Sequence, residues 1–216
     1  VRLPVIAKLE KPEAVQNLEA VVNAFDGIMV ARGDLGVELA LEKVPVVQKR
    51  AVQMCRERAK PVIVATQMLD SMISNPRPTR AETSDVANAV LDGADALMLS
   101  GETSVGTYAI ESVRTMARII HEVESEPVAV VPPLRQASRN QSDLIAQSAR
   151  DVAEGLNAEA LVAFTQSGDT VRRLARLHTR LPLLAFTPTP EVRSQLALVW
   201  GVETFLVPVF THIDEM

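Results

Sequence analysis

The sequence predicts an α/β protein built on parallel sheets, and two observations support this prediction. Short apolar segments alternate along the chain with polar breaks and with amphipathic stretches of helical spacing. The apolar segments are almost continuous rather than alternating, which is typical of parallel strands covered on both faces. With 47% hydrophobic residues in 216, the chain can also bury a large core.

Four strand–helix units occupy residues 1–125. We expect their strands at residues 4–9, 27–31, 61–65 and 94–99. The units average about 31 residues, and a closed barrel of eight such units needs about 250. The pattern therefore leaves two architectures open, namely a four-stranded open sheet or half of a barrel.

A predicted helix follows each of these strands. Pro12 suits a first helical position. Thr79 and Glu82 have the spacing of a capping box at the start of the third helix, which Gly93 closes. The residues expected on buried helix faces are Val15, Leu18, Val22 and Phe25 in the first helix, Val47, Ala51, Met54 and Arg58 in the second, and Ile110, Val113, Ala117 and Ile120 in the fourth.

The second part of the chain repeats the α/β pattern after a connector. Residues 126–140 contain three prolines and mostly polar neighbours, which predicts a linker. In the domain from 141 to 216 we expect helices at 143–156, 170–177 and 191–200, and strands at 160–164, 183–186 and 202–207.

Composition excludes several classes of protein. A net charge of −5 with one Trp, one Tyr and five Phe argues against a nucleic-acid binder. The apolar runs are too short to span a membrane, and no signal segment is present, so we expect a cytoplasmic protein without membrane contact. Cys55 is the only cysteine and is interpreted as a packing residue.

Charged residues stand at the ends of the first two predicted strands. Lys8 and Glu10 point to the same side of a strand because side chains alternate. Asp34 ends the next strand, and ligands of parallel α/β sheets meet the carboxyl ends of strands. Glu10 and Asp34 offer the oxygen ligands that Mg²⁺ or Mn²⁺ prefers, with Lys8 as a neighbouring positive charge. For Lys8 and Glu10 alone, an ordinary salt bridge is the alternative.

Other polar residues at strand ends extend this candidate site. Gly33 lies in a turn where the backbone can approach an anion closely. Thr66 and Ser100 end the third and fourth strands, and their hydroxyls can orient a carboxylate or pass a proton. The alternative for each hydroxyl is a simple capping hydrogen bond.

A second candidate site lies between a strand and a helix of the C-terminal domain. Its hydroxyls and backbone N–H groups at a helix start are typical of a phosphate-binding nest. The loop consists of Thr165, Gln166, Ser167, Gly168, Asp169 and Thr170. Arginines follow at 172, 173 and 176, and the alternatives are a plain helix cap and a solvated basic face.

Five segments, in order, resemble the signature segments of the pyruvate kinase family. They are residues 3–15 around Ala7-Lys8-Leu9-Glu10, 26–36 with Ala31-Arg32-Gly33-Asp34, 65–69, 75–89 and 99–103. The resemblance implies that 1–125 form strands five to eight of a (β/α)₈ TIM barrel. It implies that residues from about 140 form most of an α/β regulatory domain, and that the K⁺ ligands and much of the nucleotide site belong to a preceding part of a longer protein.

The resemblance also implies roles for single residues in phosphoryl transfer from phosphoenolpyruvate to ADP, which gives pyruvate and ATP. Glu10 and Asp34 match the ligands of the divalent metal, and Lys8 matches the lysine that stabilises the transferred group. Gly33, Asp34 and Thr66 match a clamp for the substrate carboxylate. Thr66 and Ser100 match hydroxyls that help protonate the enolate.

For partners, the resemblance implies a homotetramer with residues 75–89 at a subunit interface. It implies a phosphorylated allosteric effector in the loop 165–170, where Asp169 adds a negative charge. Two other hypotheses stay open. One is a different metal-dependent barrel enzyme of phosphoenolpyruvate or pyruvate, an aldolase or lyase, and the other is a non-catalytic fragment for effector binding or assembly.

Overall fold

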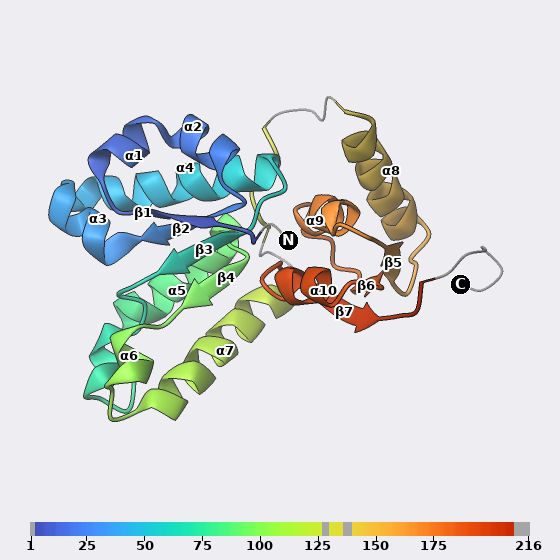
Figure 1. Cartoon of the computed structure of the whole chain (residues 1–216). Helices are drawn as coiled ribbons and strands as arrows, with labels where there is room; N and C mark the ends of the chain where they lie inside the picture. Colours follow the sequence, from blue (N-terminus) through green and yellow to red (C-terminus); the bar gives the residue numbers. More distant parts are fainter. Residues whose placement is uncertain (1–2, 127–129, 136–139, 210–216) are drawn as a thin grey trace. The chain divides into compact units, whose positions relative to one another are not determined.

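A computed structural model describes residues 3–126, 130–135 and 140–209. The chain divides into two compact units, Val1–Pro132 and Pro133–Met216, and each is described here by itself. Parts of the predicted linker, at 127–129 and 136–139, lie outside the described residues, as does the end of the chain from 210 to 216. Both units combine helices with parallel strands, so the predicted α/β class is confirmed (Figure 1).

The first unit contains the predicted succession of strands and helices. Its strands are β1 (Ile6–Leu9), β2 (Gly27–Ala31), β3 (Val62–Ala65) and β4 (Ala96–Met98). Its helices are α1 (Pro12–Gln16), α2 (Leu18–Ala24), α3 (Arg32–Glu38), α4 (Val44–Glu57), α5 (Arg80–Asp92), α6 (Gly101–Ser104) and α7 (Ala109–Ser125), with short 3₁₀ turns η1 (Leu41–Lys43) and η2 (Asp70–Ile73).

The described strands of this unit form one parallel sheet in the order β1-β2-β3-β4. In its register Leu9 lies opposite Val30, and Ala31 lies opposite Ala65. Ala65 in turn lies opposite Met98. The carboxyl ends of all four strands therefore reach the same edge of the sheet, and the residues that follow each strand are brought together there.

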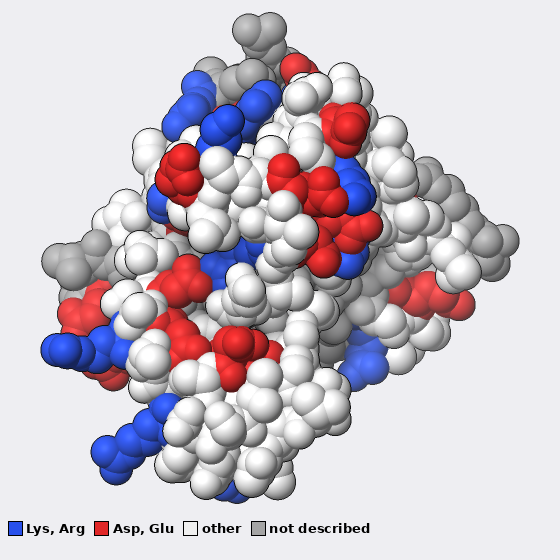
Figure 2. All heavy atoms as spheres, turned by 90° about the vertical axis from the view of Figure 1, so that its left-hand side faces the viewer, with Lys and Arg blue, Asp and Glu red and all other residues white. Residues whose placement is uncertain are grey.

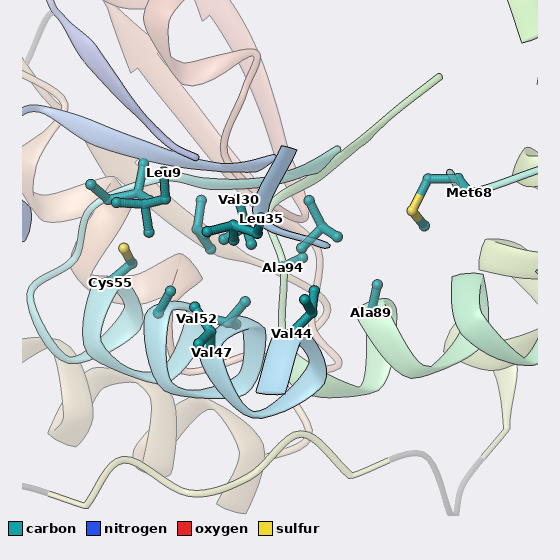
Figure 3. Close-up of a cluster of buried hydrophobic side chains, with 14 of the residues drawn as sticks. Leu9, Val30, Leu35, Val44, Val47, Val52, Cys55, Met68, Ala89 and Ala94 are labelled. Carbon is teal, nitrogen blue, oxygen red and sulfur yellow. The ribbon is translucent and has the colours of Figure 1, made fainter. Parts of the chain in front are cut away.

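The core lies on the side of the sheet that α4 covers. Leu9 and Val30 point to this side and are fully buried, and they face Val47 and Val52 of α4 (Figure 3). Cys55 belongs to the same cluster, and burial raises the pKa of its thiol to about 12. The thiol is therefore neutral at physiological pH, in agreement with its interpretation as a packing residue.

The first predicted helix is broken at Asn17. The Asn17 side chain donates to the Glu13 carbonyl at 2.9 Å and so competes with the backbone ladder. The result is two short helices, α1 and α2, in place of one. Leu18 and Val22 are nevertheless buried as predicted.

The predicted buried face of α7 is wrong as far as Ala117, which is itself exposed. Ile110 and Val113 are 68% and 52% exposed, whereas Ser112, Thr115 and Met116 are buried. The Ser112 hydroxyl donates to the Tyr108 carbonyl, and Thr115 accepts from Arg118. Because these partners lie on the same helix or at its start, the polar side chains can face the interior at little cost.

The second unit is an α/β layer with a parallel sheet in the order β5-β6-β7. Its elements are α8 (Gln141–Gly155), β5 (Leu161–Phe164), α9 (Asp169–Ala175), β6 (Leu183–Thr187), α10 (Pro190–Leu196) and β7 (Val202–Leu206). All six lie within a few residues of their predicted positions. Across the part of the chain that the structure describes, no helix is both long and apolar enough to cross a lipid bilayer.

The start of α5 provides a test of the fold. Thr79 and Glu82 form the predicted capping box, and Glu82 also accepts from the N–H and hydroxyl of Ser71. Burial opposes ionisation of Glu82, but the hydrogen bonds from Ser71 and Thr79 outweigh it and lower the pKa of this carboxyl. The ionised Glu82 carboxylate thus links η2 to α5 through its hydrogen bonds with Ser71.

We predict that Glu82→Ala lowers the free energy of unfolding by about 1 kcal/mol at pH 7, because the partly buried donors of Ser71 and the cap of α5 lose their acceptor. Because the pKa of Glu82 is lower in the folded state, its ionisation stabilises the fold above the ordinary glutamate pKa of about 4.3. This contribution is lost as the pH falls from there through the folded-state pKa. Urea unfolding followed by circular dichroism at several pH values measures the effect. Ser84→Ala, at an exposed site on the same helix, is the control. If the loss of unfolding free energy caused by Glu82→Ala is the same at every pH from 7 to 3, the prediction is contradicted.

Candidate active site

Two carboxylates meet one ammonium group at the carboxyl edge of the first sheet. Lys8 Nζ lies 2.6 Å from Glu10 Oε2 and 2.8 Å from Asp34 Oδ2. Lys8 is in β1, Glu10 follows it, and Asp34 lies in the first turn of α3 directly after β2. The three side chains are between 40% and 50% exposed, so this triad is open to a ligand.

The alternation of side chains along β1 places this triad. Leu9 is fully buried toward the helices, so Lys8 points to the opposite face of the sheet. Glu10 comes two residues after Lys8 and shares its side, as the sequence predicts. Parallel register then brings Asp34 alongside from the neighbouring strand.

Contacts within the triad shift pKa values so that Lys8 and Asp34 keep their charges. Hydrogen bonds from Lys8 to Asp34 and Glu10 raise the pKa of the lysine above its ordinary value. The same contact with Lys8 lowers the pKa of Asp34. Lys8 stays an ammonium and Asp34 a carboxylate from about pH 5 to pH 10, which covers the physiological range.

The structure brings Gly33 and Thr66 together beside this triad. The Gly33 N–H donates to Thr66 Oγ1 at 2.7 Å, and the Thr66 hydroxyl donates to the Ala65 carbonyl at 2.7 Å. A Cβ on Gly33 would lie 3.2 Å from Thr66 Oγ1, a close contact that glycine avoids. A hydroxyl and a backbone donor are thus neighbours at the ends of β2 and β3.

Ser100 ends β4 and is held by Glu102 rather than by the triad. The Ser100 N–H donates to Glu102 Oε2 at 2.8 Å, while Glu102 Oε1 accepts from the Leu69 N–H at 3.0 Å. Glu102 is only 1% exposed. No role was predicted for Glu102 from the sequence, so its position as a brace between the third and fourth strand ends was missed.

Arg32 is a second residue whose role was missed. It is 8% exposed, pairs with Asp85 at 2.5 Å, and donates from Nη2 to the carbonyls of Thr66 and Gln67, each at 2.9 Å. The sequence shows that a charged residue follows an apolar strand. It does not show that this side chain points into the protein, because Arg32 takes its direction from partners on other elements.

The donor set of the triad fits a hard divalent cation. Glu10 and Asp34 supply carboxylate oxygens that already lie within hydrogen-bond distance of one common atom, and such oxygens suit Mg²⁺ or Mn²⁺. These are two protein ligands, and substrate and water supply the remainder in such sites. Among the described residues, no group of three or more His, Cys, Asp or Glu is arranged to hold a metal ion.

Charges of both signs lie on one face of the protein. Figure 2, which views the molecule from the left-hand side of Figure 1, shows groups of Asp and Glu with Lys and Arg beside or between them. The described residues on the face shown in Figure 2 form no continuous basic stripe of the kind that binds a nucleic-acid backbone.

The loop of the second unit is closed by its own hydrogen bonds. Thr165 Oγ1 accepts from the Gly168 N–H at 2.8 Å, and Gly168 has a φ of +79°, which favours glycine. Gln166, Ser167 and Thr170 are exposed. The loop therefore presents backbone and hydroxyl groups to solvent at the start of α9.

Acidic partners hold the arginines that follow this loop. Arg173 pairs with Asp169 at 2.7 Å and with Asp143 of α8, and Arg176 pairs with Asp143 at 2.5 Å. The side chains of Arg173 and Arg176 are 20% and 7% exposed, so they do not form the solvated face considered as an alternative. Arg172 donates to the Ser167 carbonyl at 3.2 Å.

Comparison with protein families gives matches over both units. Residues 1–113 match the family model described as "Pyruvate kinase, barrel domain". Residues 143–216 match "Pyruvate kinase, alpha/beta domain". The four-stranded parallel sheet of the first unit is consistent with part of such a barrel.

Individual relatives agree with the family models. The chain is 72% identical over 215 residues to a pyruvate kinase of Mycobacterium tuberculosis and 73% identical to one of Mycobacterium intracellulare, in each case covering 100% of this chain and 45% of the relative. A crystal structure of a pyruvate kinase from Cryptosporidium parvum superimposes with a TM-score of 0.90 at 38% identity, over 98% of this chain and 44% of that one.

The chain thus spans a little under half the length of the curated relatives it matches. Its five signature segments, the strand-end triad and the two family models point to the same assignment. This chain belongs to the pyruvate kinase family.

Proposed function

We propose that this chain is part of a longer pyruvate kinase, which transfers a phosphoryl group from phosphoenolpyruvate to ADP and gives pyruvate and ATP. The single observation that carries the proposal is the triad of Lys8, Glu10 and Asp34 at the carboxyl edge of a barrel-domain sheet. Active sites of such barrels lie at this edge. Family membership and identities above 70% support the same activity.

In this proposal Glu10 and Asp34 hold Mg²⁺ or Mn²⁺. When bound, the ion supplies Lewis-acid stabilisation of negative charge on phosphate, enolate oxygen and carboxylate. Lys8 contributes a fixed positive charge, which its raised pKa maintains throughout the physiological range. That charge stabilises the transferring phosphoryl group and is worth most in the transition state.

Gly33, Asp34 and Thr66 would bind the substrate carboxylate. The Gly33 N–H donates to Thr66 Oγ1 at 2.7 Å, and the Thr66 hydroxyl donates to the Ala65 carbonyl. Both groups would exchange these hydrogen bonds for bonds to the substrate carboxylate. Once the phosphoryl group has left, the enolate takes a proton at carbon to become pyruvate. Thr66 and Ser100 would orient the path of that proton through water, and Glu102 fixes the backbone of Ser100.

Further properties of the full-length enzyme are part of the proposal. Residues 1–125 form the second half of the catalytic barrel, 126–140 a linker, and 141–216 part of the regulatory domain. The enzyme is a cytoplasmic, allosteric homotetramer in which residues 75–89 contact another subunit. A phosphorylated effector binds in the loop 165–170, and K⁺ is held by residues outside this chain.

The activity is tested by a coupled assay on the full-length protein that carries this sequence. We expect pyruvate and ATP to form only when phosphoenolpyruvate, ADP and Mg²⁺ are all present. Residues 1–216 alone should give negligible turnover, because a four-stranded half-barrel holds half of a site. Pyruvate release without ADP would favour the lyase or aldolase hypothesis, and turnover by the 216-residue chain would contradict the half-site argument.

A second prediction concerns the metal ligands. Glu10→Gln and Asp34→Asn keep the side-chain shape but remove a charge each, and we expect either change to weaken Mn²⁺ binding by at least about 100-fold, more than loss of an outer-shell partner does. Electron paramagnetic resonance titration of free Mn²⁺ measures this in the full-length protein. Glu13→Gln, an exposed acid on α1, is the matched control, and unchanged affinity in the first two variants would disprove the ligand assignment.

A third prediction concerns Lys8. Lys8→Met keeps an unbranched, flexible side chain, one atom shorter, without the charge. We expect kcat to fall by about 10²- to 10³-fold while KM for phosphoenolpyruvate changes little. Steady-state kinetics at saturating Mg²⁺ separate the two parameters. A large rise in KM with kcat intact would assign Lys8 to ground-state binding instead.

A further inference from the structure

An unfavourable backbone turn presents Thr66 at the end of β3. Thr66 and Gln67 have φ values of +68° and +52°. Two successive residues with side chains rarely adopt this left-handed region, because Cβ crowds the following carbonyl. Strain of this kind persists only where surrounding contacts over-determine the conformation, and it gathers at functional sites.

Arg32 supplies those contacts from one guanidinium group. Its Nη2 donates to the carbonyls of both strained residues, Thr66 and Gln67, each at 2.9 Å, and its Nε lies 3.3 Å from the Thr66 carbonyl. Both carbonyl groups of the turn therefore converge on one side chain. A planar fork with several donors suits this task, whereas a lysine ammonium does not reproduce its geometry.

The guanidinium is itself fixed from the opposite side. Arg32 Nη1 pairs with Asp85 Oδ2 of α5 at 2.5 Å and lies 3.5 Å from Gln48 Oε1 of α4. Two helices behind the sheet thus aim Arg32 at the turn, and its 8% exposure leaves little room for movement.

We propose that Arg32 is a positioning residue, which holds the Thr66–Gln67 turn in its left-handed form and thereby fixes the Thr66 hydroxyl against the Gly33 N–H. The catalytic part of this inference rests on the proposed function, because Thr66 is assigned there to the substrate carboxylate and the enolate. Arg32 itself points into the protein and acts through Thr66.

The first test does not depend on activity. Arg32→Lys in the full-length protein should accelerate amide hydrogen exchange at Gly33 by about tenfold, because the acceptor Oγ1 is no longer held in place. Asp85→Asn, which loosens Arg32 without removing it, should give a smaller change in the same direction. Unchanged Gly33 exchange in folded Arg32→Lys and Asp85→Asn proteins would overturn the proposal.

A double-mutant cycle tests the link to catalysis. Arg32→Lys should lower kcat on the order of 10- to 100-fold when Thr66 is present, as expected for a misplaced group. In a Thr66→Ala background the same change should have little further effect, since Arg32 acts through that side chain. Equal losses in both backgrounds would mean a general structural role and would contradict the proposal.

Glycine substitution provides a rescue with a matched control. Gln67 is exposed, and Gln67→Gly removes the cost of the left-handed conformation at one of the two residues of the turn. It should therefore restore part of the Gly33 protection and of kcat in the Arg32→Lys protein. Asn157→Gly, at an exposed residue with a φ of +50° in the other unit, should restore neither. Absence of rescue by Gln67→Gly would overturn the proposal. If every protein, including the unmutated one, lacked pyruvate kinase activity, the proposed function would be refuted. The exchange test would still decide the role of Arg32 in that case.

Discussion

The contact of one ammonium with two carboxylates is the constraint on which the candidate site depends. Glu10 and Asp34 are two negative charges from neighbouring strands, and without a cation between them their repulsion would drive them apart. Lys8 lies within 2.8 Å of both and keeps them at the strand ends. The same arrangement suits the proposed chemistry, in which a divalent ion and a lysine share the charge of a phosphorylated substrate.

Burial, strand register and buried hydrogen bonds together place the backbone and side chains of the candidate site at one edge of the sheet. Burial of Leu9 fixes the direction of Lys8, and parallel register sets Asp34 beside it. The next two strand ends are braced from within the protein, by Arg32 at the left-handed turn and by Glu102 between the third and fourth strands. Buried charged groups thus hold the half-buried residues Thr66 and Ser100 at these strand ends.

Most of this arrangement could be predicted from sequence, because parallel strands bring their carboxyl ends together wherever the strands lie along the chain. Lys8, Glu10 and Asp34 were predicted as a group for that reason. The braces could not be predicted. The left-handed residues Thr66 and Gln67 are not glycines, so they leave no local signal, and their conformation depends on Arg32 at the start of α3. Likewise, apolar periodicity predicted the wrong buried face for the start of α7. Ser112 and Thr115 are buried there instead, because their hydroxyls make hydrogen bonds along the helix.

The most direct measurement of the central claim is the anomalous scattering of Mn²⁺ in crystals of the full-length protein grown with oxalate, a planar dianion in place of the enolate. The account predicts one peak at coordination distance, about 2.0–2.2 Å, from oxygens of both Glu10 and Asp34, with oxalate completing the shell and Lys8 turned toward the anion. A peak elsewhere, with Lys8 still bridging the two carboxylates, would contradict it.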